Sequence, residues 1–406
     1  MNIRSINLLV VSEILLTFAL SFSGSTGSIL VKISRILVVF AYLVSLILGK
    51  VRLSALKNGY TLWSFLFIGF CAFSYIWAVS KKYATENLTS QLYIIIPAVI
   101  ISGTIIENRE VLFKLIKAVI WGSVAHGIYI YGLNGPLVYL STRGSGDLEN
   151  SNTLGYVSSA AIVFCYILLY VEKKQKNLYK VLMVANVVFA VLTASRKVYI
   201  FIGIFFVIAL IMKTKNPVKV FRNFIVLCIL AIAGYYSLMR VDFLYELVGE
   251  RFETMLDGFS GENTDASTGF RLQLIQWGLE WFKNRPILGY GNNCYAYLLG
   301  STYNTWAGSE GVYAHNNYIE LMVDLGVFGL LIYYSFYICS VFHALREHKY
   351  NTLAIYSIAI FVSMVVTEYG QITYDKGFMQ IVLLLAWSLS LSIFNTKNGG
   401  KNGKRN

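Results

Sequence analysis

Long apolar runs recur along most of the chain, and they constrain its fold more than any other feature of the sequence. The hydrocarbon core of a bilayer is about 30 Å thick, so one spanning helix needs about 20 mostly apolar residues. By that measure the candidate spans are residues 6–22, 29–48, 60–79, 89–106, 111–132, 153–171, 178–194, 198–212, 223–238, 317–340, 351–368 and 377–394. With 56% hydrophobic and 14% charged residues, the composition agrees. We therefore expect an all-α polytopic membrane protein with about twelve transmembrane helices.

The distribution of basic residues between the spans predicts the orientation of the chain, because Lys and Arg accumulate in cytoplasmic loops. If the N-terminus is cytoplasmic, most Lys and Arg residues outside the spans also fall on the cytoplasmic side. The short outer loops hold a smaller group of cations: Lys81, Lys82, Arg143, Arg196, Lys197 and Lys376. We therefore expect both termini to be cytoplasmic.

These spans predict four regions along the chain. Residues 1–238 hold the first nine spans, 239–316 form a large extracytoplasmic loop, 317–394 hold the last three spans, and 395–406 form a basic cytoplasmic tail. Acidic residues outnumber basic ones in the large outer loop. The net charge of +13 therefore reflects topology, and it does not predict a nucleic-acid partner.

The large outer loop contains two stretches with helical amphipathic spacing, residues 241–256 and 270–283. In the second stretch, the polar stripe consists of Gln273, Gln276, Glu280 and Lys283. The turn-rich segment "DGFSGENTDASTG" separates the two. Pro286 ends the second helix, and Gly289 and Gly291 permit a tight return. We expect two amphipathic helices that lie on the outer membrane face or pack over the bundle.

His315 stands at the outer mouth of an apolar span, in the stretch "YAHNNYIELMVDLGVFGLLIYY". A neutral imidazole can accept a proton near pH 7, as a general base must. A lone histidine at this place is also consistent with an ordinary polar helix end. Asn316 can cap the helix, and Glu320 and Asp324 follow at helical spacing. Because carboxylates are costly in an apolar span, these two acids indicate a polar cavity.

Three arginines on the predicted outer side are candidate phosphate ligands: Arg143, Arg196 and Arg271. A guanidinium group stays charged and can contact two phosphate oxygens at once. Each of them can equally be an interface anchor, but together around one cavity they suit a diphosphate. The sequence has no D-x-D pair to hold a divalent metal between phosphates. We therefore expect neutralisation by arginine without a metal site.

The order of several short motifs resembles the O-antigen ligase and O-antigen polymerase superfamily of bacterial membrane glycosyltransferases. An R…G…N-x-N-like segment runs from Arg143 through Asn150 and Asn152, and an S-R pair follows at Ser195 and Arg196. The outer loop then carries Ser267 to Trp277, with looser spacing than the family pattern, and a P-x-x-G-x-G turn from Pro286 to Gly291. The last motifs are H-N-x-x-x-E at His315 to Glu320 and G-x-x-G at Gly326 to Gly329.

The resemblance implies a GT-C-like glycosyltransferase without a cofactor at the outer face of the cytoplasmic (inner) membrane. Its donor would be an oligosaccharide on undecaprenyl diphosphate, held by Arg196 and Arg271 with Arg143. His315 would be the catalytic base and act with inversion, supported by Asn316, Glu320 and Asn152. The acceptor would be another glycan, as in an O-antigen, capsule or exopolysaccharide polymerase. A ligase that transfers the glycan to lipid A core or another acceptor is the alternative. Other polysaccharide assembly proteins are expected partners besides the lipid bilayer.

A lipid-linked oligosaccharide flippase or transporter is the hypothesis from a different class. Glu13, Lys32 and Arg35 are ionisable residues in the first two spans, and such residues often mark a transport path. The sequence contains no convincing internal repeat, whereas many transporters are built from repeats. Together with the outer position of the three arginines, this favours the transferase.

Overall fold

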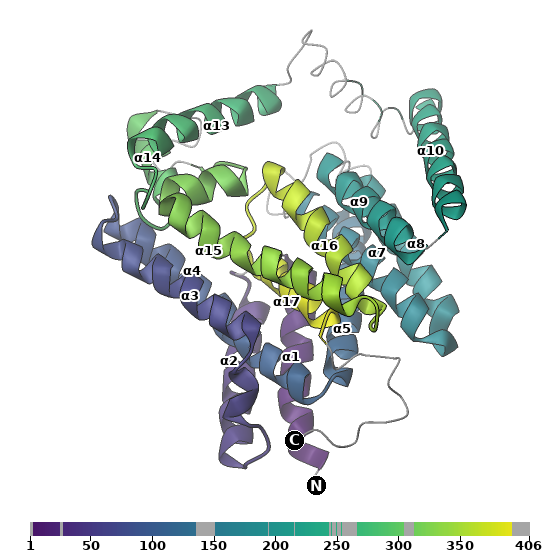
Figure 1. Ribbon diagram of the computed structural model, residues 1–406, viewed down its shortest axis with the longest axis horizontal. Helices are drawn as coiled ribbons and strands as arrows, with labels where there is room; N and C mark the ends of the chain where they lie inside the picture. The colour runs from purple at the N-terminus through teal and green to yellow at the C-terminus, as the bar shows by residue number, and fades with distance from the viewer. Residues whose placement is uncertain are drawn as a thin grey trace.

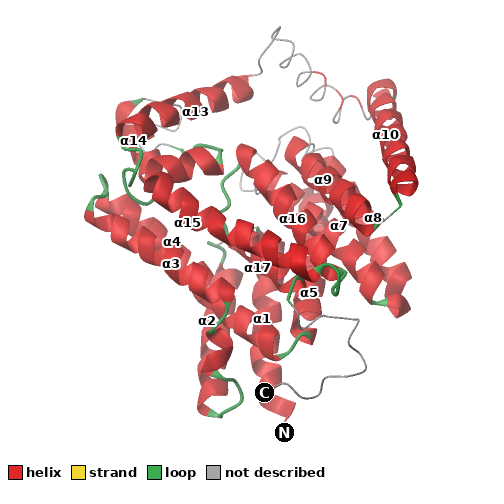
Figure 2. Cartoon of the chain, in the orientation of Figure 1, coloured by secondary structure: helices red, strands yellow, loops and turns green. Residues whose placement is uncertain are grey.

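The computed structural model describes residues 3–24, 27–134, 151–193, 195–214, 216–242, 266–303 and 312–391, together with residues 245, 249 and 253. Within these ranges all regular secondary structure is helical, as Figure 2 shows. The α-helices labelled in Figure 1 are α1 (Ile3–Ser23), α2 (Ile29–Ile47), α3 (Gly59–Phe73), α4 (Lys81–Glu107), α5 (Glu110–Asn134), α7 (Ser151–Val171), α8 (Lys176–Leu192), α9 (Arg196–Lys213), α10 (Pro217–Arg240), α13 (Ala266–Asn284), α14 (Cys294–Thr302), α15 (Asn317–Glu347), α16 (Leu353–Thr367) and α17 (Gly377–Leu389). Short 3-10 helices lie at Leu53–Leu56, Ser74–Ile76, Lys173–Gln175 and Glu368–Gly370.

A helix lies at each segment that the sequence predicts to span the membrane: α1 to α5, α7 to α10 and α15 to α17. In the described residues, seven segments are long and apolar enough to cross a bilayer: Ile29–Ile47, Gly59–Ile76, Lys81–Glu107, Glu110–Gly132, Asn152–Val171, Asn317–Glu347 and Leu353–Gly370. Leu8–Ser23 and Gly377–Leu389 form shorter apolar helices. The all-α, multi-pass prediction is therefore confirmed, whereas the twelve spans and the GT-C-like arrangement remain predictions.

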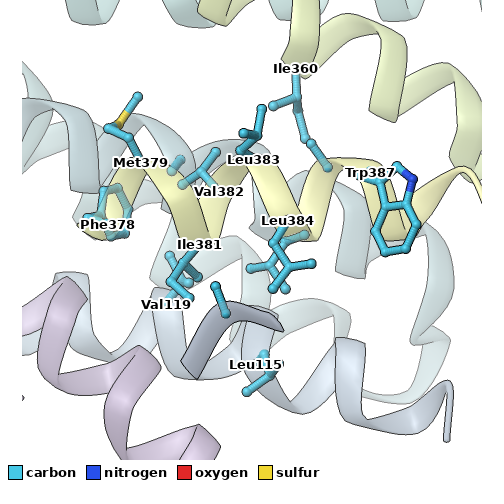
Figure 3. Close-up of a cluster of buried hydrophobic side chains, with 14 of the residues drawn as sticks. Leu115, Val119, Ile360, Phe378, Met379, Ile381, Val382, Leu383, Leu384 and Trp387 are labelled. Atoms are coloured by element: carbon cyan, nitrogen blue, oxygen red, sulfur yellow. The ribbon is translucent and has the colours of Figure 1, made fainter. Parts of the chain in front are cut away.

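Helix α17 lies in the hydrophobic core, and every one of its residues is buried. Figure 3 shows Val382, Leu383 and Leu384 of α17 among side chains of other helices, including Val119 of α5 and Ile360 of α16. A helix that is apolar on all sides is stable only when neighbours cover it. The packing therefore fixes the beginning of α17, at Phe378 and Met379, relative to α5 and α16.

Helix α15 is interrupted at Gly326, where φ is 65° and the backbone leaves the helical region. The interruption exposes carbonyl groups of the preceding turn, and the 286–291 turn occupies this place. The N–H groups of Tyr290 and Gly291 donate to the carbonyls of Val323 (2.9 Å) and Asp324 (2.7 Å). In return, the N–H of Val327 donates to the carbonyl of Pro286 at 2.9 Å. The predicted P-x-x-G-x-G turn therefore packs directly against the part of α15 that carries the predicted G-x-x-G motif.

The predicted return after Pro286 is confirmed by two glycines with positive φ, 68° at Gly289 and 107° at Gly291. A side chain on either residue would be strained, because L residues rarely adopt such angles. The other face of this turn contacts α4. Asn292 at its end accepts from the Asn87 side chain at 3.2 Å and donates to the Gln91 side chain at 3.1 Å. The turn therefore links α4 and α15.

Helix α13 confirms the predicted amphipathic helix at 270–283 and places its polar stripe, Gln273 to Lys283, on the exposed side. Its apolar face packs against α14 and the start of α15, through Leu274, Trp281, Tyr295 and Ile319. Figure 1 shows α13 and α14 at the end of the molecule opposite to the start of α1. The other predicted helix, 241–256, falls mostly on residues outside the described ranges. Helix α14 was not predicted from the sequence.

Candidate functional site

A cavity of about 110 Å³ lies where four helices begin. It is lined by Gly24, Asn152, Thr153, Tyr156, Lys197, Tyr313, His315, Gln371, Ile372, Lys376, Phe378 and Met379. Asn152 lies in the first turn of α7 and Lys197 in the first turn of α9, while His315 precedes α15 and Lys376 is the N-cap of α17. Helix N-termini carry partial positive charge and unpaired N–H groups, so their convergence favours an anion.

His315 has φ of +54°, a left-handed conformation that non-glycine residues seldom adopt. Such a conformation persists only where the surrounding structure enforces it, and it is frequent at functional sites. The imidazole lies against the Tyr313 ring, with 4.1 Å between the ring centroids. The side chain is partly buried and lines the cavity. His315 is therefore held in one orientation toward the cavity.

Two side chains on α15 hold the loop that carries His315. The Asn316 side chain accepts from the N–H groups of Tyr318 (3.0 Å) and Ile319 (3.2 Å), which confirms its predicted role as the helix cap. The Glu320 carboxylate accepts from the N–H of Ala314, the residue before His315. Both supporting residues thus act on the backbone around His315, and in the described structure neither lines the cavity.

Asn317 connects this loop to the segment before α17. Its side-chain oxygen accepts from the N–H groups of Thr373 (2.9 Å) and Tyr374 (3.3 Å). The same amide donates to the Tyr334 hydroxyl at 3.0 Å. The contact brings Lys376 to the cavity that His315 lines, although the two residues are distant in sequence.

The predicted N-x-N and S-R motifs meet at the other side of the cavity. The Ser195 hydroxyl donates to the Asn152 side-chain oxygen at 3.0 Å, which joins the starts of α7 and α9. Asn152 lines the cavity, as does Lys197. Arg196, the predicted phosphate ligand, is partly buried at the start of α9 and is not among the lining residues. At the start of α9 it is therefore Lys197, and not Arg196, that lines the cavity.

Arg271 lies in α13 and is partly buried. It does not line the cavity itself, but its charge is close enough to His315 to lower the pKa of the imidazole. The sequence therefore brings Arg271, Lys197 and His315 together from three separate elements. Arg143, the third predicted arginine, lies outside the described residues.

The cavity strongly favours a neutral imidazole. Burial lowers the pKa of His315 to about 3, and the positive charges of Arg271, Lys197 and Lys376 contribute in the same direction. At neutral pH the ring therefore carries one proton and has one free lone pair. The cations stay available for an anion, since the histidine adds no positive charge.

The carboxylates of α15 do not line the cavity, in contrast to what their place in an apolar span suggested. Asp324 is fully buried and accepts from the N–H groups of Asn293 (2.8 Å) and Tyr295 (2.7 Å) and from the Tyr374 hydroxyl (3.2 Å). Glu320 is equally buried and accepts from the loop before α15. Their cost in the span is offset by backbone donors, so both acids position loops.

Six residues with polar side chains that line the cavity were not predicted as site residues: Thr153, Tyr156, Lys197, Tyr313, Gln371 and Lys376. Lys197 and Lys376 were recognised only as cations of the outer loops. The sequence signal that could have identified these two lysines is their position at the start of two predicted spans. Among the described residues, no group of three or more His, Cys, Asp or Glu side chains could hold a metal ion.

Comparison with known proteins adds an independent observation. Residues 178–334 match the family model described as O-antigen ligase. The match includes Arg196, Arg271 and His315, and it confirms the predicted O-antigen ligase and polymerase superfamily. The match supports a glycosyltransferase-like membrane enzyme that uses a lipid-linked glycan and an acceptor. The O-antigen ligase match ends before Lys376 and begins after Asn152, so part of the cavity lies outside it. No curated protein matches the chain.

Proposed function

We propose that this protein is a polysaccharide polymerase at the outer face of the cytoplasmic membrane, with both termini in the cytoplasm. It transfers an oligosaccharide from undecaprenyl diphosphate to an acceptor glycan, with inversion and without a metal ion. The observation that carries this proposal is the neutral His315 imidazole in a cavity bordered by cations and helix N-termini. A base beside an anion site is what transfer from a lipid diphosphate requires.

In the proposed reaction, the acceptor hydroxyl gives its proton to the free nitrogen of His315 while its oxygen attacks the anomeric carbon of the donor. The bond between that carbon and the phosphate oxygen breaks, and its electron pair leaves with the lipid diphosphate. Attack from the opposite side inverts the anomeric carbon. Since the diphosphate is already a good leaving group, orientation and charge stabilisation are the protein's main contributions.

The leaving diphosphate gains negative charge, which Arg271 and Arg196 would stabilise with Arg143. Arg271 is supported by its electrostatic effect on His315. Arg196 is supported by its place in the first turn of α9, beside a residue that lines the cavity.

The test is transfer by purified protein with a synthetic undecaprenyl-diphosphate oligosaccharide, with and without a chelator. We expect His315→Ala to lower the rate about 100-fold to 10,000-fold, the usual contribution of a general base. His348→Ala is the matched control, because His348 caps the other end of α15. A control rate near wild type, with an unchanged thermal-unfolding midpoint for both variants, separates chemistry from folding.

Two results would contradict the proposal. If His315→Ala retains transfer near the wild-type rate, His315 is only a helix-end residue. If wild type moves the lipid-linked oligosaccharide across liposomes and transfers nothing, the protein is a flippase. If the chelator abolishes wild-type transfer, only the claim that the reaction needs no metal ion is wrong.

The acceptor distinguishes a polymerase from a ligase, and the same assay can identify it. Trp277 of α13 and Tyr303 after α14 are stacked, with 4.0 Å between ring centroids, at the end of the molecule that carries the outer loop. Both side chains are partly exposed, and aromatic faces of this kind suit sugar rings. A ladder of multiplied repeat units is expected when only lipid-linked donor is present. Transfer only after lipid A core is added would identify a ligase.

A further inference from the structure

Two lysines line the cavity beside His315, and the proposed reaction gives neither of them a role. Lys197 comes from the first turn of α9, and Lys376 is the N-cap of α17. The backbone of each lysine therefore lies at a helix N-terminus, where the helix itself already favours negative charge. The described lining of the cavity contains no carboxylate, although Asp375, next to the cavity, forms an ion pair with Lys376.

The Lys197 side chain crosses from α9 to the end of α16, where its ammonium donates to the carbonyl of Gly370. Burial, and then the charge of Arg271, lower the pKa of Lys197 to about 7, so a bound diphosphate would also favour its ammonium form. An ammonium group has three N–H donors, and this carbonyl uses one of them. The contact anchors the side chain beside the cavity and leaves donors for a further acceptor. Lys197 is thus placed in advance, with less freedom to lose when a ligand binds.

Lys376 is held differently. Its ammonium lies 3.2 Å from the Asp375 carboxylate and 5.6 Å from the centre of the Tyr313 ring. The Asp375 carboxylate is the main cause of the raised pKa of Lys376, so this lysine is charged at neutral pH. Nearly half of the side-chain surface remains exposed, 48%. Its charge can therefore meet an anion that enters the cavity.

We propose that Lys197 and Lys376 bind the diphosphate of the lipid-linked donor, on two sides of His315 and in addition to Arg271. The inference deepens the proposed function and depends on it for the identity of the donor. The cavity of about 110 Å³ has room for a few groups of the size of water, which suits the phosphates better than a sugar chain. The glycan would then extend outside it.

This arrangement couples donor binding to the strength of the base. The titratable and charged groups around His315 are Tyr156 from α7, Lys197 from α9, Arg271 from α13, Tyr313 and Glu320 on either side of it, and Asp375 and Lys376 before α17. Its pKa is lowered partly by the three cations. A bound diphosphate offsets their charge, so the pKa of His315 rises and the imidazole accepts a proton more readily. The base thus becomes effective when the donor is present.

The experiment measures binding of undecaprenyl diphosphate without sugar to the full-length protein in nanodiscs. Undecaprenol, which has the same lipid chain and no phosphate, is the second probe. We expect Lys197→Gln and Lys376→Gln each to weaken diphosphate binding about tenfold or more, without changing undecaprenol binding. Lys197→Arg and Lys376→Arg are expected to restore most of the affinity. Lys82→Gln is the matched control, because Lys82 is an exposed lysine in the first turn of another helix, α4, and does not line the cavity.

The outcomes separate this inference from the proposed function. If wild type transfers glycan while both Gln variants bind diphosphate as wild type does, the two lysines do not bind the diphosphate. In that case the lysine inference is wrong and the proposed function is unaffected. If diphosphate binding by wild type depends on the two lysines but wild type transfers nothing, the lysine site is supported and the transferase function is wrong. If wild type does not bind diphosphate, both are overturned. A loss that Arg fails to restore, with a lowered unfolding midpoint, also counts against a binding role.

Discussion

The interruption of α15 at Gly326 gives a direct test of how the site is assembled. A Cβ added to Gly326 would lie 2.2 Å from the carbonyl oxygen of Ile287 and 2.7 Å from the N–H nitrogen of Leu288. Both atoms belong to backbone, so no side-chain rotation can relieve the clash. Gly326→Ala must therefore displace the 286–291 turn from α15.

The magnitude follows from backbone strain and from the hydrogen bonds that the displacement breaks. A non-glycine residue in the left-handed region costs about 1–2 kcal/mol. Displacing the turn also removes the backbone hydrogen bonds of Tyr290, Gly291 and Val327, each worth about 1 kcal/mol. We expect Gly326→Ala to destabilise the protein by about 4–5 kcal/mol. Since the turn connects α13 to α15, the substitution also separates Arg271 from His315 and lowers transfer.

The assay combines thermal unfolding in detergent with amide hydrogen exchange of the peptides that cover residues 286–293 and 323–330. We expect a lower midpoint and faster exchange at both places. Gly69→Ala is the control, because a Cβ at this helical glycine meets no atom within 4 Å and alanine favours a helix. If Gly326→Ala unfolds and exchanges like Gly69→Ala, the turn does not hold α13 on α15 and the reasoning is wrong.

Three further predictions concern the same region. The pH dependence of kcat/KM reports the pKa of His315 in the free enzyme, and that of kcat reports its pKa in the donor complex. We expect kcat/KM to fall on acidification only well below pH 6.5, and kcat to fall at a higher pH than kcat/KM. If both fall at the same pH, donor binding does not raise the pKa of His315. Between pH 6.5 and about 3 the unfolded chain binds a proton at His315 that the folded protein does not, so acidification favours unfolding by up to about 1.4 kcal/mol per pH unit. His315→Gln should therefore flatten the dependence of the unfolding midpoint on pH. Asp324→Asn replaces a carboxylate oxygen by an NH2 group, which faces the N–H donors of Asn293 and Tyr295. We expect a destabilisation of about 2–4 kcal/mol and faster amide exchange at these two residues. Unchanged exchange would refute this prediction.

Local features of the site were predictable from the sequence because their causes are local. Asn316 caps α15 through bonds to residues two and three positions ahead. The return at Gly289 and Gly291 depends on angles that glycine adopts easily. The polar stripe of α13 follows from helical spacing. In each case the residue type alone limits the backbone nearby.

The sequence could not show whether Arg196 or Lys197 lines the cavity, and the reason is geometric. Neighbouring residues on a helix point about 100° apart, since a turn contains 3.6 residues. An S-R pair at the start of a span therefore does not reveal which of the next side chains points into a cavity. That depends on the rotation of α9, which is set by packing such as that of Val198 and Phe201. The structure places Lys197 on the cavity side.

Buried acids explain how a loop site is kept rigid on a membrane bundle. Glu320 accepts from the residue before His315, and Asp324, one turn further along α15, accepts from the residues that follow the 286–291 turn. Inside a low-dielectric span a hydrogen bond is stronger than in water, and an N–H that left these acids would strand a buried polar group. The loop before α15 and the segment after the 286–291 turn are therefore both fixed to one helix, α15. This explains why the acids lie beside the site without entering it: they hold the loop that carries His315 and the 286–291 turn against α15.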